Sequence, residues 1–455
     1  MAPLVPVQSA PTIRQGERVA DDWYRLFGSP VLDGLVRDAL AGNPDIAAAR
    51  ARIERARAHW RAVSGGDEPQ LDARSGLNHI RADPASIGLP SSGALDETLF
   101  SGLLRLSYSV DLFGRRQRAK EGAEADIAFA HAEALGVYEG LVNHVVVAAL
   151  DLATQQSLKE ATENIIDALQ RQLDIALMQE RAGTVAFAET LTLRARIESM
   201  QATLPGLDQQ RTAAAMALAA LLGRAPSDVL IPALRLDDFT IPPALPASLP
   251  SELVRQRPDI LAAEQRLRAA NARIGVAQAD RLPSITLGAD FGGIAHRGVD
   301  LFAGDSLLWA VGGELTAPIL DGGTRKAQLE MARATYREAE ADYRATVLRA
   351  FSEVSTSLSA IGSDAATLEA RNRALRTAKQ AMDVSEAQYR AGTHDLLQLL
   401  NANLEYRNAM LQRVSSQARQ YVSVATLMEA LGGGWWNAPS DPFSAERSTS
   451  PGTAD

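Results

Sequence analysis

Residues 347–390 read VLRAFSEVSTSLSAIGSDAATLEARNRALRTAKQAMDVSEAQYR, and this stretch decides the fold. A period of seven places an apolar stripe along one face of an α-helix and is typical of coiled-coil packing. Apolar side chains follow that period here, at Val347, Val354, Ile361, Leu368, Leu375, Met382 and Tyr389. No proline interrupts the pattern between Gly322 and Arg390. The sequence therefore predicts one helix of about 69 residues, roughly 100 Å long, packed against a partner helix.

Two segments of the chain recur about 210 residues farther on. The segment NPDIAAARARIERARA, which starts at Asn43, matches RPDILAAEQRLRAANA, which starts at Arg257, at an offset of 214. The four residues RAGT at 181–184 recur at 390–393, at an offset of 209. Self-similarity of this kind indicates a tandem duplication. Each copy is predicted to contain a helix, two strands, a very long helix, a turn and a returning helix.

The first copy carries the same apolar stripe, which Lys159 interrupts once. Its members are Tyr138, Val145, Leu152, Ile166 and Leu173. After the RAGT turn, a returning helix is predicted over residues 184–222. Pro205 lies inside this helix and removes one backbone hydrogen bond, so we expect a kink there.

Four segments alternate between apolar and polar residues, as strands with one covered face do. They are residues 70–79, 99–112, 283–293 and 307–320. Each is about ten residues long, the length that a tilted membrane strand needs. A soluble sheet packed on helices is the alternative, but hairpins at the end of such a long helix favour lipid as the cover. Because a closed barrel takes at least about eight strands, several chains must share it.

Composition excludes several classes of protein. The chain has 455 residues and a net charge of -9, so no broad basic surface is available for nucleic acid. It contains no cysteine, which excludes disulfides and thiolate metal sites. No run of 18 or more apolar residues predicts a membrane-spanning helix. The opening residues MAPLVPVQSAPT lack the regions of a signal peptide, so signal peptide and lipidation cysteine are not present in this chain.

No set of residues indicates catalysis, a cofactor or a bound metal. The six histidines include no pair at metal-ligand spacing. An enzyme would need a convergent nucleophile, base or set of metal ligands, so we predict that the chain is not an enzyme and has no cofactor. A coiled-coil structural scaffold would explain the heptads, but it leaves the four alternating segments unexplained.

Five motifs, in this order along the chain, resemble those of the TolC-like outer membrane factor family. The similarity is strongest to its branch of multidrug (RND-type) efflux outer-membrane lipoproteins, and it covers residues 21–436. The motifs are WYRLFGSPVLDGLVRDAL from Trp23, VDLFGRRQ from Val110, LAALLGRAP from Leu218, LPSELVRQRPDILAAEQRLRAANARIGVAQADRLPSI from Leu249 and ALGGGW from Ala430.

The resemblance implies an α+β fold in which a homotrimer forms one transmembrane β-barrel of twelve strands, four from each chain. This barrel would continue into a long α-helical periplasmic barrel with a small mixed equatorial domain. Two repeats are expected, the first at 31–222 with its coiled-coil hairpin at 114–222, and the second at 258–431 with its hairpin at 322–431. The equatorial domain would consist of an N-terminal segment at 1–30, a linker at 223–257 and a final segment, with a disordered tail, at 432–455.

The resemblance also assigns functional residues. Leu397 takes the position of a leucine that constricts the closed pore, and Asn401 takes the position, four residues on, that is usually an aspartate. Three asparagines only hydrogen-bond where three aspartates would bind cations, so we expect weak cation block. The helix tips match the motif on which hairpins of a periplasmic adaptor dock, with Arg181, Gly183, Thr184, Arg390, Gly392 and Thr393.

The implied function is that of an outer-membrane channel subunit of a tripartite efflux pump, a passive exit duct for drugs or other small molecules. Its partners would be two further copies of itself, a periplasmic adaptor, an inner-membrane pump and outer-membrane lipid. Its place would be the bacterial outer membrane, with an extension into the periplasm. Type I protein secretion and metal efflux stay open as alternatives, because such a duct contributes little to substrate selection.

Overall fold

The computed structural model describes residues 11–16, 19–82, 95–225, 233–247, 250–391, 393, 395–438 and 441–443. Its internal contacts divide the chain into two compact units. The first comprises Met1–Arg50, Ala132–Leu261 and Ala345–Asp455, and the second comprises Ala51–His131 and Ala262–Arg344. Because these segments interleave, each unit draws residues from both halves of the sequence.

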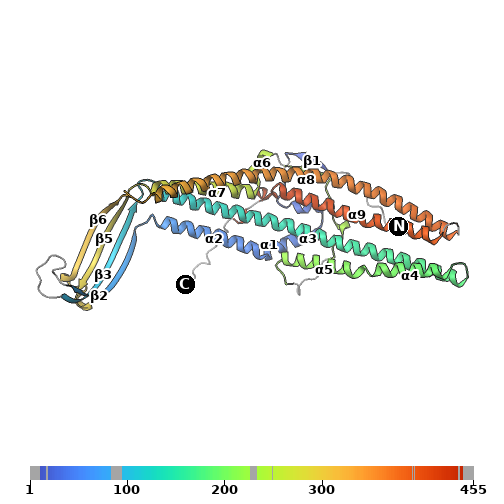
Figure 1. The fold of residues 1–455 in the computed structure, drawn as a ribbon, viewed down its shortest axis with the longest axis horizontal. Coiled ribbons are helices and arrows are strands. Elements are labelled where there is room, and N and C mark those ends of the chain that lie inside the picture. Colours follow the sequence, from blue (N-terminus) through green and yellow to red (C-terminus); the bar gives the residue numbers. More distant parts are fainter. Residues whose placement is uncertain are drawn as a thin grey trace, which may run out of the picture. The chain divides into compact units, whose positions relative to one another are not determined.

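The second unit contains a four-stranded antiparallel sheet (Figure 1). Its strands are β2 (Gln70–Ala82), β3 (Leu95–Val110), β5 (Ser284–Ala295) and β6 (Leu307–Thr316), and they lie in the order β2-β3-β5-β6. Within the described part of the chain, β2 and β6 are therefore the two edges of the sheet. β6 ends at Thr316 rather than at the predicted residue 320. Pro318 follows closely, and proline has no N–H for a strand ladder.

The register of the sheet places apolar residues side by side across all four strands. One such row is Ala73, Leu104, Phe291 and Trp309. On the opposite face, Arg105 is paired with Asp290, and its Nε lies 2.7 Å from Asp290 Oδ1. The apolar face is exposed within the chain, with Trp309 at 74% and Val311 at 76% of full exposure. The four alternating segments thus form a sheet with one polar face and one apolar face that the described residues leave largely uncovered.

Two helical hairpins make up most of the first unit (Figure 1). Their helices are α3 (Arg115–Arg181), α4 (Phe187–Gln201) and α5 (Leu204–Leu221) in one, and α8 (Thr324–Arg390) and α9 (Leu396–Ala430) in the other. Val145 and Leu152 of the first heptad stripe are buried, and so are Ile361 and Leu368 of the second. The heptad stripes therefore form the packed faces of the long helices.

Lys159, which interrupts the first stripe, forms a polar link between α3 and α5. Its Nζ lies 3.0 Å from Asp208 Oδ1, and Arg211 donates a hydrogen bond to the same oxygen atom. The hydrogen bond from Lys159 is the main cause that lowers the pKa of Asp208. The break in the heptad pattern is therefore a site of ion pairing along the seam.

The returning helix of the first hairpin is divided near Pro205 instead of running unbroken from 184 to 222. α4 ends at Gln201 and α5 begins at Leu204, so Pro205 lies in the first turn of a new helix. The first turn of a helix has no intrahelical partner for its N–H groups, and proline is tolerated there. The expected kink is thus a complete helix break.

Short elements from distant parts of the sequence pack together in the first unit. Strand β1 (Thr12–Gln15) pairs in parallel with β4 (Ala244–Ala247). The Tyr421 hydroxyl donates a hydrogen bond of 2.7 Å to the Phe239 carbonyl oxygen, and both rings contact Phe27. The remaining helices are α1 (Pro30–Gly42), α2 (Pro44–Gly65), α6 (Pro250–Gln256) and α7 (Pro258–Ala279).

One described helix, α3, is long and apolar enough to cross a membrane by length and composition alone. Its most apolar window of 18 residues has a mean hydropathy of 1.3, and 56% of that window is buried within the chain. A core helix of a packed bundle has the same properties, so this helix alone is weak evidence for a membrane span. The disordered tail is predicted from about Ser440, and its residues 440 and 444–455 lie outside the described part of the chain. Residues 441–443 are described, and Phe443 among them is buried.

Candidate functional site

The turn between α3 and α4 carries three of the predicted tip residues. Gly183 has a φ of 73°, and its N–H donates to the Glu180 carbonyl oxygen at 2.9 Å. The N–H and Oγ1 of Thr184 both donate to the Gln179 carbonyl oxygen, at 2.9 and 3.0 Å. This is the Schellman arrangement that ends helices, and its left-handed residue favours glycine. Arg181 is exposed, so a defined turn presents a cationic side chain.

The turn between α8 and α9 shows the same hydrogen bonds at its described residues. The N–H and Oγ1 of Thr393 both donate to the Gln388 carbonyl oxygen, at 3.0 and 3.1 Å. Arg390 is exposed, and its Nη2 lies 2.5 Å from Glu386 Oε1. Gly392 lies outside the described residues. The threonines of the two RAGT motifs therefore have equivalent surroundings.

Leu397 and Asn401 lie on one exposed face near the start of α9. Residues four positions apart are neighbours on a helix surface, and both side chains are exposed, with Leu397 at 64%. The opposite face of α9 packs through Leu396 and Leu399, which are buried. Leu396 belongs to an apolar cluster with residues of α3 and α4. The helix is thus anchored on one side and presents the two predicted pore residues on the other.

A second candidate site lies where α9 ends and α7 begins, at residues 257–259 and 430–434. We call it the α9–α7 junction. Gly432, Gly433 and Gly434 follow α9 with φ values of 97°, 75° and 87°. A Cβ atom on Gly433 would overlap the Glu139 carboxyl of α3, and one on Gly434 would overlap the Ala20 carbonyl oxygen. All three positions favour glycine because of their left-handed backbone, and close contacts exclude a side chain at Gly433 and Gly434.

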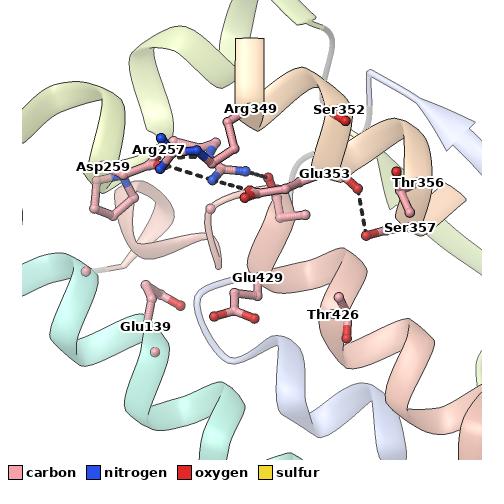
Figure 2. Close-up of a pocket in the computed structure, with 15 residues that line it drawn as sticks. Glu139, Arg257, Asp259, Arg349, Ser352, Glu353, Thr356, Ser357, Thr426 and Glu429 are labelled. Carbon is pink, nitrogen blue, oxygen red and sulfur yellow. Dashed lines mark hydrogen bonds and ion pairs between the residues drawn. The ribbon is translucent and has the colours of Figure 1, made fainter. Parts of the chain in front are cut away.

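The Arg257 side chain joins three helices at the α9–α7 junction (Figure 2). Its Nη1 donates to the Ala430 carbonyl oxygen of α9 at 2.8 Å. Its Nη2 lies 2.8 Å from Asp259 Oδ2 of α7 and 2.6 Å from Glu353 Oε2 of α8. The side chain is only 9% exposed, so its charge is held by these two carboxylates rather than by water.

The matching position in the first copy holds a neutral side chain. Asn43, which aligns with Arg257, donates from Nδ2 to the Leu221 carbonyl oxygen at the end of α5, at 2.9 Å. Its Oδ1 accepts a hydrogen bond of 2.7 Å from the Asp45 N–H. Both side chains therefore satisfy a carbonyl group that the end of a helix leaves free. Only Arg257 adds an ionic link to a long helix.

A cavity of about 630 Å³ opens beside the α9–α7 junction, between α3, α7, α8 and α9 (Figure 2). Its lining includes the carboxyl groups of Glu139, Asp259, Glu353 and Glu429 and the guanidinium groups of Arg257 and Arg349. Glu139 is 6% exposed, and its Oε1 has no hydrogen-bond partner among the described residues. The cavity thus contains a buried acid with one carboxyl oxygen that no described residue satisfies.

Burial raises the pKa of Glu139 to about 8. The negative charges of Asp21 and Glu429 act in the same direction, while the Trp23 indole and the Trp435 backbone N–H partly oppose the rise. Burial also raises the pKa of Glu429. Glu139 is therefore protonated at neutral pH in the folded chain, which is unusual for a glutamate.

Sequence reasoning identified the tips and the two α9 residues but missed Glu139, Glu429 and the role of Arg257. The signal for Glu139 was present. Leu135 and Val142 lie four residues before and three residues after it, and both are buried, so the glutamate lies on an apolar helix face. For Arg257, the signal was a charged residue directly before a helix that begins with proline. Among the described residues, no group of three or more His, Cys, Asp or Glu side chains is placed to hold a metal ion.

The family model of the outer membrane efflux proteins matches residues 35–224 and 249–433. Two named relatives resemble the chain over nearly its whole length. The pyoverdine export outer membrane protein OpmQ of Pseudomonas putida is 30% identical over 96% of this chain and 93% of its own. The outer membrane protein OprJ of Pseudomonas aeruginosa is 31% identical over 95% of this chain and 91% of its own.

Solved structures of outer-membrane channels have the same fold. The outer-membrane channel OprN superposes with a TM-score of 0.87, with 29% identity over 94% of this chain and 95% of its own. The open-state MtrE channel of Neisseria gonorrhoeae superposes with a TM-score of 0.82, with 27% identity over 95% and 98%. These matches confirm the resemblance of the five sequence motifs, and this chain belongs to the outer membrane efflux protein family.

Proposed function

We propose that the chain is the outer-membrane channel subunit of a tripartite efflux pump, a passive exit duct for small molecules across the periplasm and the outer membrane. The four-stranded sheet carries this proposal, because no described residue covers most of its apolar face or pairs with its outer strands β2 and β6. A bilayer tolerates neither an open sheet edge nor a polar face toward lipid. Three copies joined through β2 and β6 would close a barrel of twelve strands, with the Arg105–Asp290 face toward the lumen.

The duplicated hairpins would continue this duct into the periplasm. The two copies have the same order of elements and equivalent hydrogen bonds at their tips, which supports a tandem duplication with repeats at 31–222 and 258–431. The segments 1–30, 223–257 and 432–445 would form the equatorial domain. The β1–β4 pair and the hydrogen bond of 2.6 Å from Asn437 Nδ2 to the Val19 carbonyl oxygen join these segments.

The helix tips are the proposed docking sites for a periplasmic adaptor, which would connect the duct to an inner-membrane pump. Both tips present an exposed arginine, Arg181 or Arg390, next to a threonine fixed by two hydrogen bonds. Gly183 and Gly392 complete the motif. A rigid turn loses little conformational freedom on binding, which favours its use as a contact surface.

The proposed pore constriction is formed by Leu397, with Asn401 four residues farther along the same face of α9. Both side chains are exposed within one chain, as residues that meet their copies at a pore axis would be. The constriction would be apolar and uncharged, so opening would depend on the packing of Leu397 and on contact at the tips.

The exported compound distinguishes the alternatives. Besides the pyoverdine export protein, relatives of this chain include outer membrane proteins of a toluene efflux pump and of an antibiotic efflux pump, both from Pseudomonas putida. These names favour small molecules over protein secretion. Metal efflux is the other alternative, and a coiled-coil scaffold is disfavoured because it would not need the sheet. The family is one of efflux channels rather than enzymes.

Ion conductance in planar bilayers tests the proposal directly. The purified chain is expected to form discrete channels, and its expression in a strain that lacks its own exit duct is expected to restore drug resistance when the matching adaptor and pump are present. A charge-matched chain without residues 284–316 should do neither. Failure of the full chain to insert into bilayers would contradict the channel proposal. If the chain restores resistance to metal salts instead of drugs, the exported compounds are metal ions rather than drugs.

A further inference from the structure

We propose that Glu139, Asn143 and Glu429 form a binding site for a divalent metal cation, held through oxygen atoms and part of its water shell. Glu139 and Glu429 line the cavity at the α9–α7 junction (Figure 2), and Asn143 is joined to Glu429 by a hydrogen bond. The site is separate from the pore residues and from the helix tips. The proposal holds whether or not the chain conducts.

The three side chains converge from two helices. Glu139 and Asn143 are one turn apart on the same face of α3. Asn143 Nδ2 donates a hydrogen bond of 2.6 Å to Glu429 Oε2, which brings α9 directly against that face. The carboxyl group of Glu429 is near enough to raise the pKa of Glu139 by its charge. Figure 2 shows the two carboxyl groups extending into the same part of the cavity.

Two of the oxygen atoms have no partner in the chain. Glu139 Oε1 and Asn143 Oδ1 are buried and accept no hydrogen bond from any described residue. Both residues are 6% exposed. A buried acceptor without a donor costs about 1–3 kcal/mol, and this cost falls when a cation or water occupies the adjacent space. The unsatisfied atoms therefore point to a ligand that carries positive charge.

The nearby cations compensate these carboxyl groups only in part. The Arg257 guanidinium is bound to Asp259, Glu353 and the Ala430 carbonyl oxygen. Arg349 is exposed and comes from α8. The charges of His144 and Arg257 both lower the pKa of Glu429, but burial outweighs them and raises it. From the N-terminal segment, Asp21 adds a further negative charge near Glu139. The electrostatic environment of Glu139 thus favours a bound positive charge.

The ligand set decides the class of metal. Two carboxyl groups and one amide oxygen are hard donors, which suit magnesium or calcium rather than zinc or copper. The described residues supply too few carboxylates for a closed protein shell, so bound water would complete the coordination. A cavity of about 630 Å³ leaves space for that water. Magnesium keeps several waters when one or two carboxylates bind it, which matches this arrangement.

Titration of the purified full chain in detergent tests the proposal. After removal of metals with a chelator, magnesium chloride and calcium chloride are added separately at pH 8, with choline chloride at equal ionic strength as the control. Tryptophan fluorescence is a local readout because the Trp23 side chain lies beside the Glu139 carboxyl group. A saturable change is expected with at least one of the two metals.

Variants separate this site from other acids. Glu139→Gln and Glu429→Gln are each expected to weaken binding at least tenfold. Glu369→Gln removes the same charge from an exposed residue that pairs with Arg373 on α8, and it should leave binding unchanged. Asn143→Asp adds a third carboxylate and should tighten binding. The proposal is overturned if the wild-type chain shows no saturable change, or if both glutamine variants bind as it does. If Glu139→Gln does not fold, Glu429→Gln alone decides between these outcomes.

Discussion

Glu139 is the residue whose charge state depends most on the fold. Its carboxyl lies against the backbone of Gly433, and the unfolded chain would expose it to water. Burial is the main cause of its raised pKa, and the charges of Asp21 and Glu429 add to it. A proton that the folded chain holds and the unfolded chain releases links stability to pH.

The first prediction is a loss of stability as the pH rises, measured without divalent cations. Between the ordinary pKa of 4.5 and about 8 the folded chain binds the Glu139 proton and the unfolded chain does not. The free energy of unfolding therefore falls through this window and levels off above it. Melting curves by circular dichroism at pH 6, 7, 8 and 9 measure it. Glu139→Gln should melt with a flatter dependence on pH, and parallel curves for the two chains would rule this explanation out.

The second prediction concerns the uncharged constriction. Because Asn401 cannot bind cations as an aspartate would, divalent cations should block the channel weakly. Asn401→Asp should strengthen the block severalfold, and Leu397→Ala should raise single-channel conductance because it removes an apolar obstruction. Bilayer recordings with added magnesium measure both effects. Strong block of the wild-type channel that Asn401→Ala abolishes would refute the electrostatic argument, and Glu369→Gln, a change at an exposed residue of α8, serves as the control.

At the scale of elements, each copy joins two shorter helices end to end beside one long helix. Asn43 fastens the α5–α2 junction with a neutral hydrogen bond, and Arg257 fastens the α9–α7 junction with one hydrogen bond and two ionic contacts. Removal of a buried charged residue leaves the opposite charges of its partners unpaired. The two junctions should therefore differ in strength.

The third prediction is that Arg257→Ala destabilises the chain more than Asn43→Ala does. The arginine variant should cost about 2–4 kcal/mol, because Asp259 and Glu353 lose their shared partner while remaining partly exposed. The asparagine variant should cost about 1 kcal/mol for its neutral hydrogen bond. Melting temperatures in the same detergent give the order. Arg257→Asn, which copies the first junction, should fall between the two, and equal melting of all three variants would contradict the comparison.

The sheet is the second element with a strong functional constraint. Successive residues of β6 point to opposite faces of the sheet, so Val311 and Ala310 are adjacent in sequence but differ in their surroundings. Val311 lies opposite Ala289 on the apolar face of the sheet, whereas Ala310 lies opposite Asp290 on the polar face.

The fourth prediction uses this pair. Val311→Lys should destabilise the inserted sheet by about 2–4 kcal/mol if the residue lies near the middle of the bilayer. Ala310→Lys places the same charge on the polar face and should be tolerated. Folding into lipid vesicles in a series of urea concentrations measures both variants. If the two lysines are tolerated equally, the apolar face does not contact lipid.

At the scale of the whole molecule, the open sheet edges make the chain incomplete. In the described part of one copy, β2 and β6 are unpaired edges, while the helices bury much of the heptad stripes within the chain. The helical unit can thus be packed in one copy, but the sheet needs neighbours in lipid.

The fifth prediction is an assembly of three chains that resists detergent. Without heating, electrophoresis in dodecyl sulfate should show a species of about three times 48.6 kDa. Heating should convert it to the single chain, since barrels unfold only at high temperature in this detergent. A chain that runs at 48.6 kDa without heating and stays in solution without detergent would favour the scaffold instead.

Much of the fold could be predicted because its signals are local and repeated. The heptads of α8 and the alternation in β6 each extend over many residues, and the duplication shows both patterns twice. The β1–β4 pair could not be predicted. Each strand has four residues, and Thr12 lies opposite Ala244, far away in sequence. So short a strand has no clear periodicity, and its position depends on contacts that form only in the folded chain.

The residues of the candidate sites also divide into those that the sequence could indicate and those that it could not. The roles of the tips and of Leu397 were assigned from the family resemblance of short motifs and stay predictions, whereas the turn at Gly183 could be predicted because a left-handed position favours glycine. Glu139 and Glu429 come from helices almost 300 positions apart in the chain, and a glutamate in a helix ordinarily faces water. Their proximity is a property of tertiary packing. The stripe of small and apolar residues around Glu139 was the available sign.

The two open sheet edges also have a genetic consequence. If every copy completes the wall of its neighbours, a damaged subunit does not act alone when it is made beside a normal one. Three subunits drawn at random from equal pools would all be normal in about one assembly in eight. A defective allele that still pairs through β2 and β6 would therefore be dominant, whereas an allele that removes the sheet would be recessive.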